Sequence, residues 1–131
     1  MANSTGAGRA RWGSNRGRRL TLADDKWVRI MCDFGAEPIW DRQGAPAHLY
    51  ELPVSEELRQ RLANWQATFE SEGDTPHPPG SISVAAFSAE GIAIARAVKA
   101  ALPDWTVVYF DEEKAAPSPV DRPRSYFEYE V

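Results

Sequence analysis

Asp33, Glu37 and Asp41 stand at four-residue intervals along the chain. Carboxylate oxygens grouped in this way can hold a hard cation such as Mg²⁺ or Ca²⁺, or they can transfer protons. On a helix the three side chains would share one face, but Gly35 and Pro38 lie between them and oppose a helix. We therefore expect solvated carboxylates beside a turn at the end of a strand.

A second acidic group, Asp111, Glu112 and Glu113, follows the apolar run 105–110. If that run pairs in parallel with the strand before Asp33, the two carboxyl ends meet at one edge of the sheet, where ligand sites commonly form. The candidate partner-binding residues are Asp33, Glu37, Trp40, Asp41, Asp111, Glu112 and Glu113. The same carboxylates leave open an alternative function, a small metal-dependent hydrolase.

Nucleophilic catalysis has little support in the sequence. Cys32 alternates with Val28 and Ile30, and a thiol on such a buried face behaves as a small inert hydrophobe. His48 and His77 lie in turn-rich stretches, so a Cys32/His48 dyad is an alternative that no spacing supports. Zinc-type spacing, a phosphate-binding glycine loop and a G-x-S-x-G elbow are all missing from the sequence. We expect no cofactor and no enzymatic activity.

Five elements are predicted to position these residues. Alternating hydrophobicity predicts strands at 27–34 and 126–131, and an unbroken β-branched and aromatic run predicts a central strand at 105–110. Apolar residues at helical spacing predict helices from Ser55 to about Glu70 and from Ser83 to Leu102. A short extended piece is expected at 48–52. Gly91 lies on the apolar stripe of the second helix, which predicts close approach of another backbone.

This order of elements predicts an α/β protein, with α+β as the alternative class. The connection from the first strand to the central one is long enough for a parallel crossover, and the last two strands can pair antiparallel. We expect residues 21–131 to form one domain, a mixed sheet of three to five strands with two helices on one face.

Charge is distributed unevenly along the chain. Residues 1–20 hold five arginines and no acid, whereas residues 21–131 hold ten Lys and Arg against nineteen acids, a net charge of −9. The first segment has no apolar periodicity, so we expect a disordered tail that contacts nucleic acid at most weakly. Its basic residues are Arg9, Arg11, Arg16, Arg18 and Arg19.

The domain itself is rich in aromatic residues, with five Trp, five Phe and four Tyr in the whole chain. Aromatic side chains are enriched in protein interfaces, and a surface of one charge sign steers a partner of the other sign. A single cysteine, no secretory h-region and no long apolar run favour a cytoplasmic protein without a membrane span. We expect it to bind a basic protein.

Three segments carry a family resemblance: "WVRIMCDFGAEPIWD", "LPVSEELRQRLANWQATFES" and "AFSAEGIAIARAVKAALPDWTVVYFDEE". They resemble a group of small, largely uncharacterised bacterial proteins with the pattern RxMxDxGxxPxW, then an EG helix, then WxVxYFDE. The resemblance covers about residues 27–113 and implies a role like that of immunity partners of secreted toxins, with no catalytic residue to transfer. The pattern positions are Asp33, Gly35, Pro38, Trp40, Trp65, Glu90 and Gly91.

Overall fold

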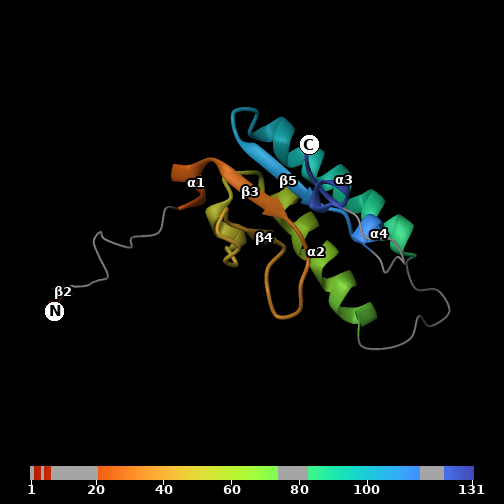
Figure 1. Ribbon diagram of the computed structural model, residues 1–131, viewed down its shortest axis with the longest axis horizontal. Coiled ribbons are helices and arrows are strands. Elements are labelled where there is room, and N and C mark those ends of the chain that lie inside the picture. The colour runs from red at the N-terminus through yellow and green to blue at the C-terminus, as the bar shows by residue number, and fades with distance from the viewer. Residues whose placement is uncertain (1, 4, 7–20, 74–82, 116–122) are drawn as a thin grey trace.

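The computed structural model describes residues 2–3, 5–6, 21–73, 83–115 and 123–131. Figure 1 shows a small sheet with two long helices beside it. The elements in chain order are β1 (Ala2–Asn3), β2 (Thr5–Gly6), α1 (Leu22–Asp25), β3 (Trp27–Ile30), β4 (Ile39–Trp40), η1 (Leu49–Glu51), α2 (Glu56–Gly73), α3 (Val84–Ala101), β5 (Thr106–Phe110), α4 (Glu112–Ala115), η2 (Arg124–Tyr126) and β6 (Glu128–Glu130).

The main sheet has four strands in the order β4-β3-β5-β6. β3 pairs in parallel with β5, with Val28 opposite Val107 and Ile30 opposite Tyr109, whereas β4 and β6 pair antiparallel at the two edges. The long crossover through α2 and α3 makes the parallel pair sterically feasible, as the order of elements predicted. The predicted α/β class and the mixed sheet are confirmed.

Both long helices begin at the predicted serine caps. The Ser55 hydroxyl accepts a hydrogen bond from the Leu58 amide at 3.1 Å, and the Ser83 hydroxyl accepts one from the Ala86 amide at 3.0 Å. Each cap satisfies an amide that would lack a partner in the first helical turn. α2 continues three residues past the predicted end at Glu70.

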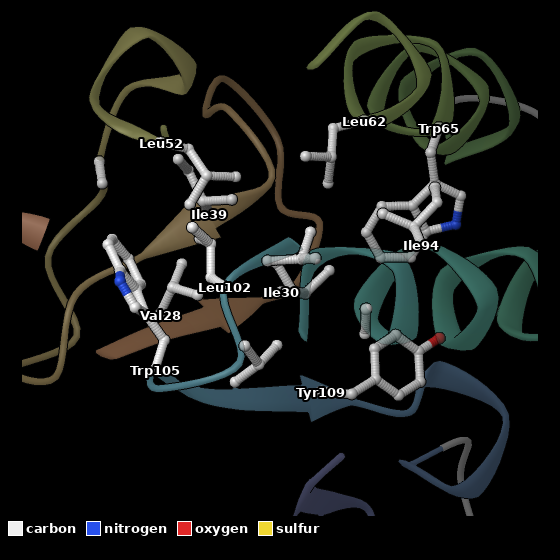
Figure 2. Packing of buried hydrophobic residues seen from close by; sticks show 14 of the residues in the cluster. Val28, Ile30, Ile39, Leu52, Leu62, Trp65, Ile94, Leu102, Trp105 and Tyr109 are labelled. Atoms are coloured by element: carbon white, nitrogen blue, oxygen red, sulfur yellow. The ribbon is translucent and has the colours of Figure 1, made fainter. Parts of the chain in front are cut away.

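One face of the sheet forms the core against α2 and α3 (Figure 2). Ile30 and Tyr109 of the sheet are fully buried with Ile94 of α3, and Trp65 of α2 packs over the same cluster. Gly91 is where this packing is tightest, because a Cβ atom there would lie 2.5 Å from Trp65 Cζ2 and 2.7 Å from Tyr109 Cε1. The glycine therefore makes room for two aromatic rings, and not for the second backbone that we predicted.

Three local predictions are wrong. β3 ends at Ile30, four residues before the predicted end. Because Phe34 lies beyond the strand, its side chain does not follow the alternation of buried and exposed residues, and it is 54% exposed where burial was predicted. Residues Leu49–Glu51 form a 3-10 helix where an extended piece was predicted. The second face of β5 is also less covered than predicted, since Val107 and Tyr109 are buried while Thr106, Val108 and Phe110 are half-buried.

The predicted tail lies almost entirely outside the described residues. Within residues 1–20 the structure describes only β1 and β2, which pair with each other in parallel. The five arginines of this segment fall outside the described part, so the predicted disorder and nucleic-acid contact stay predictions. None of the helices in the described ranges combines the length and the apolar character needed to cross a bilayer.

Candidate partner-binding site at the strand ends

The carboxyl ends of β3 and β5 meet at one edge of the sheet. Because Ile30 is opposite Tyr109, the chain leaves both strands at the same level and reaches Asp33 on one side and Asp111 on the other. α4 begins directly after β5 and carries Glu112. The pKa of Glu112 responds to the charges of both Asp33 and Asp111, which places the three carboxylates in one electrostatic neighbourhood.

Asp111 is buried and forms hydrogen bonds within the protein. Its carboxylate is 2% exposed and accepts hydrogen bonds from Ser88 Oγ at 2.7 Å, Tyr129 Oη at 2.7 Å and the Lys114 amide at 3.1 Å. Burial opposes its ionisation, yet these hydrogen bonds hold the pKa of Asp111 below its ordinary value. This side chain therefore joins α3, β5, α4 and β6, and both of its carboxylate oxygens are directed at donors within the protein.

Glu112 has the opposite environment. Burial, followed by the charges of Asp33 and Asp111, raises the pKa of Glu112 from 4.5 to about 6. The nearby ammonium of Lys114 lies over the rings of Tyr129 and Tyr126, at 5.0 and 5.6 Å from their centroids. The structure thus keeps a half-buried carboxylate beside two others, an arrangement more common at functional sites than elsewhere.

The loop after β3 is fixed against α2. The Gly35 amide donates to Glu70 Oε2 at 3.0 Å, and Gln66 Nε2 donates to the same oxygen at 2.9 Å and to the Asp33 carbonyl at 2.7 Å. Gly35 adopts a φ of 73°, a left-handed conformation that glycine reaches without a steric penalty. Phe34 then projects outward, with its inner side packed on Phe69 at a centroid distance of 4.9 Å.

We call this surface the strand-end face. It combines one exposed aromatic ring with carboxylates from the loop after β3, from α2 and from α4. Its members are Asp33, Phe34, Glu70, Glu112 and Glu113.

Besides the buried Asp111, three further candidates lie outside the strand-end face, namely Glu37, Trp40 and Asp41. β4 runs antiparallel to β3 with Trp40 opposite Arg29, so Asp41 lies toward the amino end of β3. Asp41 is 5% exposed and organises a turn, because its Oδ1 accepts the amides of Gln43 and Ala45, each at 2.9 Å. The indole of Trp40 donates to the Met31 carbonyl at 2.9 Å and fixes the start of the loop between β3 and β4.

Glu37 belongs to a separate group around η1. Its Oε1 accepts a hydrogen bond from the Leu49 amide at 2.7 Å, and its Oε2 lies 2.8 Å from His48 Nδ1. Burial opposes ionisation, but the hydrogen bonds from Leu49 and His48 hold the pKa of Glu37 below its ordinary value. The imidazole is thereby paired with a carboxylate and not with Cys32, whose thiol is buried with a pKa raised first by that burial.

Sequence reasoning missed two members of the strand-end face, Phe34 and Glu70. Phe34 continued an alternating pattern, and only Gly35 immediately after it signalled that the strand had ended. Glu70 is at the carboxyl end of the apolar stripe of α2, and its role depends on packing against a loop 35 residues earlier. No local sequence signal identifies such a contact.

Across residues 21–73, 83–115 and 123–131, no group of three or more His, Cys, Asp or Glu side chains is arranged to hold a metal ion. The carboxylates of the strand-end face therefore give no support to the metal-dependent alternative.

Fold and site together define a small α/β protein with an acidic edge. A model of the Serratia CdiI immunity protein-like family matches residues 26–112, which span the segment from the start of β3 to the first residue of α4. The match covers more than half of the chain, and the protein belongs to this family. No curated protein and no solved structure matches the chain.

Proposed function

We propose that this protein is a cytoplasmic, non-catalytic immunity protein that binds and neutralises a basic bacterial toxin through the strand-end face. Membership of an immunity protein-like family supports the general role. The acidic and aromatic character of the strand-end face supports the basic partner.

The observation that carries the proposal is the electrostatic state of Glu112. Its pKa is raised to about 6 by burial and by the charges of Asp33 and Asp111, so at neutral pH the protein holds an ionised carboxylate against the cost of desolvation and the repulsion of two other carboxylates. A lysine or arginine of a partner placed beside Glu112 would relieve that repulsion and replace the lost solvation. Binding of such a partner would therefore stabilise the ionised carboxylate of Glu112.

Phe34 supplies the apolar part of the same surface. Interfaces between proteins commonly combine an aromatic anchor at the centre with a polar rim that excludes water. Phe34 is 54% exposed, and its backbone amide donates to the Asp33 carboxylate at 2.8 Å, so ring and charge are held together. Few large hydrophobic side chains of the described residues are equally exposed.

We expect a basic toxin domain to be encoded beside this chain, and the direct test titrates that purified domain with Glu112→Gln and Phe34→Ala. We expect Glu112→Gln to weaken binding about tenfold, because the charged contact is lost. We expect Phe34→Ala to weaken binding by a similar or larger factor. Titration calorimetry of both variants against wild type measures the change.

Glu130→Gln is the matched control. Glu130 is exposed on β6 and pairs with Val108, away from the carboxyl end of β5, so the same loss of charge should leave binding within about twofold. Equal losses for Glu112→Gln and Glu130→Gln would mean that only net charge matters and would remove the strand-end face from the proposal. Failure of the wild-type protein to bind the neighbouring toxin domain would refute the function itself.

A further inference from the structure

We infer that Tyr50 and His48 form a second contact site for the same basic partner, at which the ring of Tyr50 receives a guanidinium or ammonium group. This inference rests on the proposed function and adds a surface that lies apart from the strand-end face. The ring of Tyr50 lies outside the hydrophobic core of the described residues.

Tyr50 is the most exposed of the large hydrophobic side chains of the described residues, at 79%. Its ring nevertheless has a defined orientation, since it stacks on the imidazole of His48 with a centroid distance of 5.1 Å and an interplanar angle of 6°. An exposed tyrosine that is ordered by stacking offers a flat surface at low entropic cost, which is how aromatic residues act in binding sites.

The support under this ring is rigid. The imidazole of His48 is held by Glu37, and the Leu49 amide donates to the other oxygen of the same carboxylate at 2.7 Å. The His48 amide donates to Glu51 Oε2 at 3.0 Å, while the Glu51 amide donates to the His48 carbonyl at 2.8 Å. η1 is therefore tied both to itself and to the loop between β3 and β4.

The charges around η1 favour a cation over the exposed ring. Glu37 and Glu51 accept hydrogen bonds from the Leu49 and His48 amides, whereas Glu56 is paired with Arg59. Arg59 is already occupied, because its Nη1 donates to the Leu52 carbonyl at 3.0 Å and its Nε donates to Glu56 at 3.2 Å. A cation on an aromatic face is attracted by the ring quadrupole, and flanking carboxylates strengthen that attraction.

The two sites are joined by a short piece of chain. The loop between β3 and β4 carries Asp33 and Phe34 at its start and Glu37, the support of His48, near its end. A basic partner that contacts the strand-end face therefore meets the η1 site only a few residues further along. One partner with two basic segments fits this arrangement.

The experiment compares wild type with Tyr50→Ala, Tyr50→Leu and Tyr50→Phe by calorimetry against the purified neighbouring toxin domain. We expect Tyr50→Ala and Tyr50→Leu to weaken binding about tenfold and Tyr50→Phe to stay within about threefold, because phenylalanine keeps the ring and leucine does not. Val84→Ala, at the exposed start of α3, is the control and should bind like wild type. Thermal unfolding of each variant checks that the fold is intact.

Two outcomes would overturn this inference alone, and a third would overturn the proposed function as well. If wild type binds and Tyr50→Ala binds equally well, the second site is refuted while the strand-end face stands. If Tyr50→Phe is as weak as Tyr50→Ala, the hydroxyl group and not the ring face makes the contact, which overturns the cation assignment. If wild type does not bind, the proposed function and this inference fail together.

Discussion

Asp111 and Glu112 are neighbours in the chain, but the fold gives their carboxyl groups opposite properties. Asp111 receives three hydrogen bonds and has a lowered pKa, whereas Glu112 is half-buried beside other carboxylates and has a raised pKa. The first stabilises the folded protein when it is ionised, and the second destabilises it. The binding role that we propose for Glu112 would explain why such an unfavourable group is present next to such a favourable one.

This contrast predicts a pH effect for Glu112→Gln. The folded pKa of about 6 lies above the ordinary value of 4.5, so the stability contributed by Glu112 is complete below pH 4.5 and is lost as the pH rises through 6. The variant should nearly match wild type at pH 4.5 and should be more stable at pH 7, by about 1 kcal/mol after the roughly 2 kcal/mol implied by the shift is reduced for solvent screening. Urea unfolding between pH 4.5 and pH 8 measures the difference.

Asp111→Asn provides the comparison of opposite sign. Because the pKa of Asp111 is held below 3.8, its contribution is present above that pH and is lost as the pH falls through the lower folded pKa. We expect the variant to lose about 2 kcal/mol of unfolding free energy at pH 7, since three buried donors lose a charged acceptor. A destabilised Glu112→Gln at pH 7 would show that Glu112 is not under repulsion.

At the scale of elements, α3 depends on the absence of a side chain at Gly91. Glycine in a helix interior is normally less favourable than alanine by about 1 kcal/mol. Here the rings of Trp65 and Tyr109 occupy the space that a Cβ atom would need. Packing between α2, α3 and β5 thus outweighs helix propensity at this one position.

Gly91→Ala should therefore destabilise the protein by about 1 to 3 kcal/mol, because overpacking forces both rings to move. Urea denaturation of the purified variant measures the loss. The exposed Ala93 on the same helix gives the control, since Ala93→Gly should cost about 1 kcal/mol through propensity alone. A gain in stability for Gly91→Ala would mean that the rings shift without cost.

Across the whole molecule, the acidic residues 21–131 and the basic residues 1–20 would have opposing effects on the proposed basic partner. The net charge is −4 for the chain and −9 for residues 21–131. Long-range attraction raises association rates with a partner of opposite charge, and salt screens it. A segment carrying five arginines reduces that attraction.

Removal of residues 1–20 should increase the association rate with the toxin domain several-fold at low salt and should abolish any retention on a nucleic-acid column. Stopped-flow mixing at two salt concentrations measures the first effect, and chromatography on immobilised DNA measures the second. The capping box of α1 at Thr21 is kept in this variant. Slower association of the shortened protein would instead place the removed segment in the interface.

The sequence by itself determined the elements whose signals are local. The serine caps predicted where α2 and α3 begin, and the β-branched and aromatic run predicted β5. The length of the crossover predicted the parallel pairing of β3 with β5, and therefore the meeting of Asp33 and Asp111. These features follow from hydrogen bonds and apolar periodicity within one segment, which a sequence displays directly.

Only the tertiary structure decided which carboxylates face outward. Asp33, Asp111 and Glu112 have no local sequence feature that distinguishes their environments. Asp111 nevertheless accepts hydrogen bonds from Ser88 of α3 and Tyr129 of β6. Phe34 is exposed because the chain leaves the sheet at Ile30. Burial and pKa depend on groups that meet through space from distant positions in the chain, and so no local pattern specifies them.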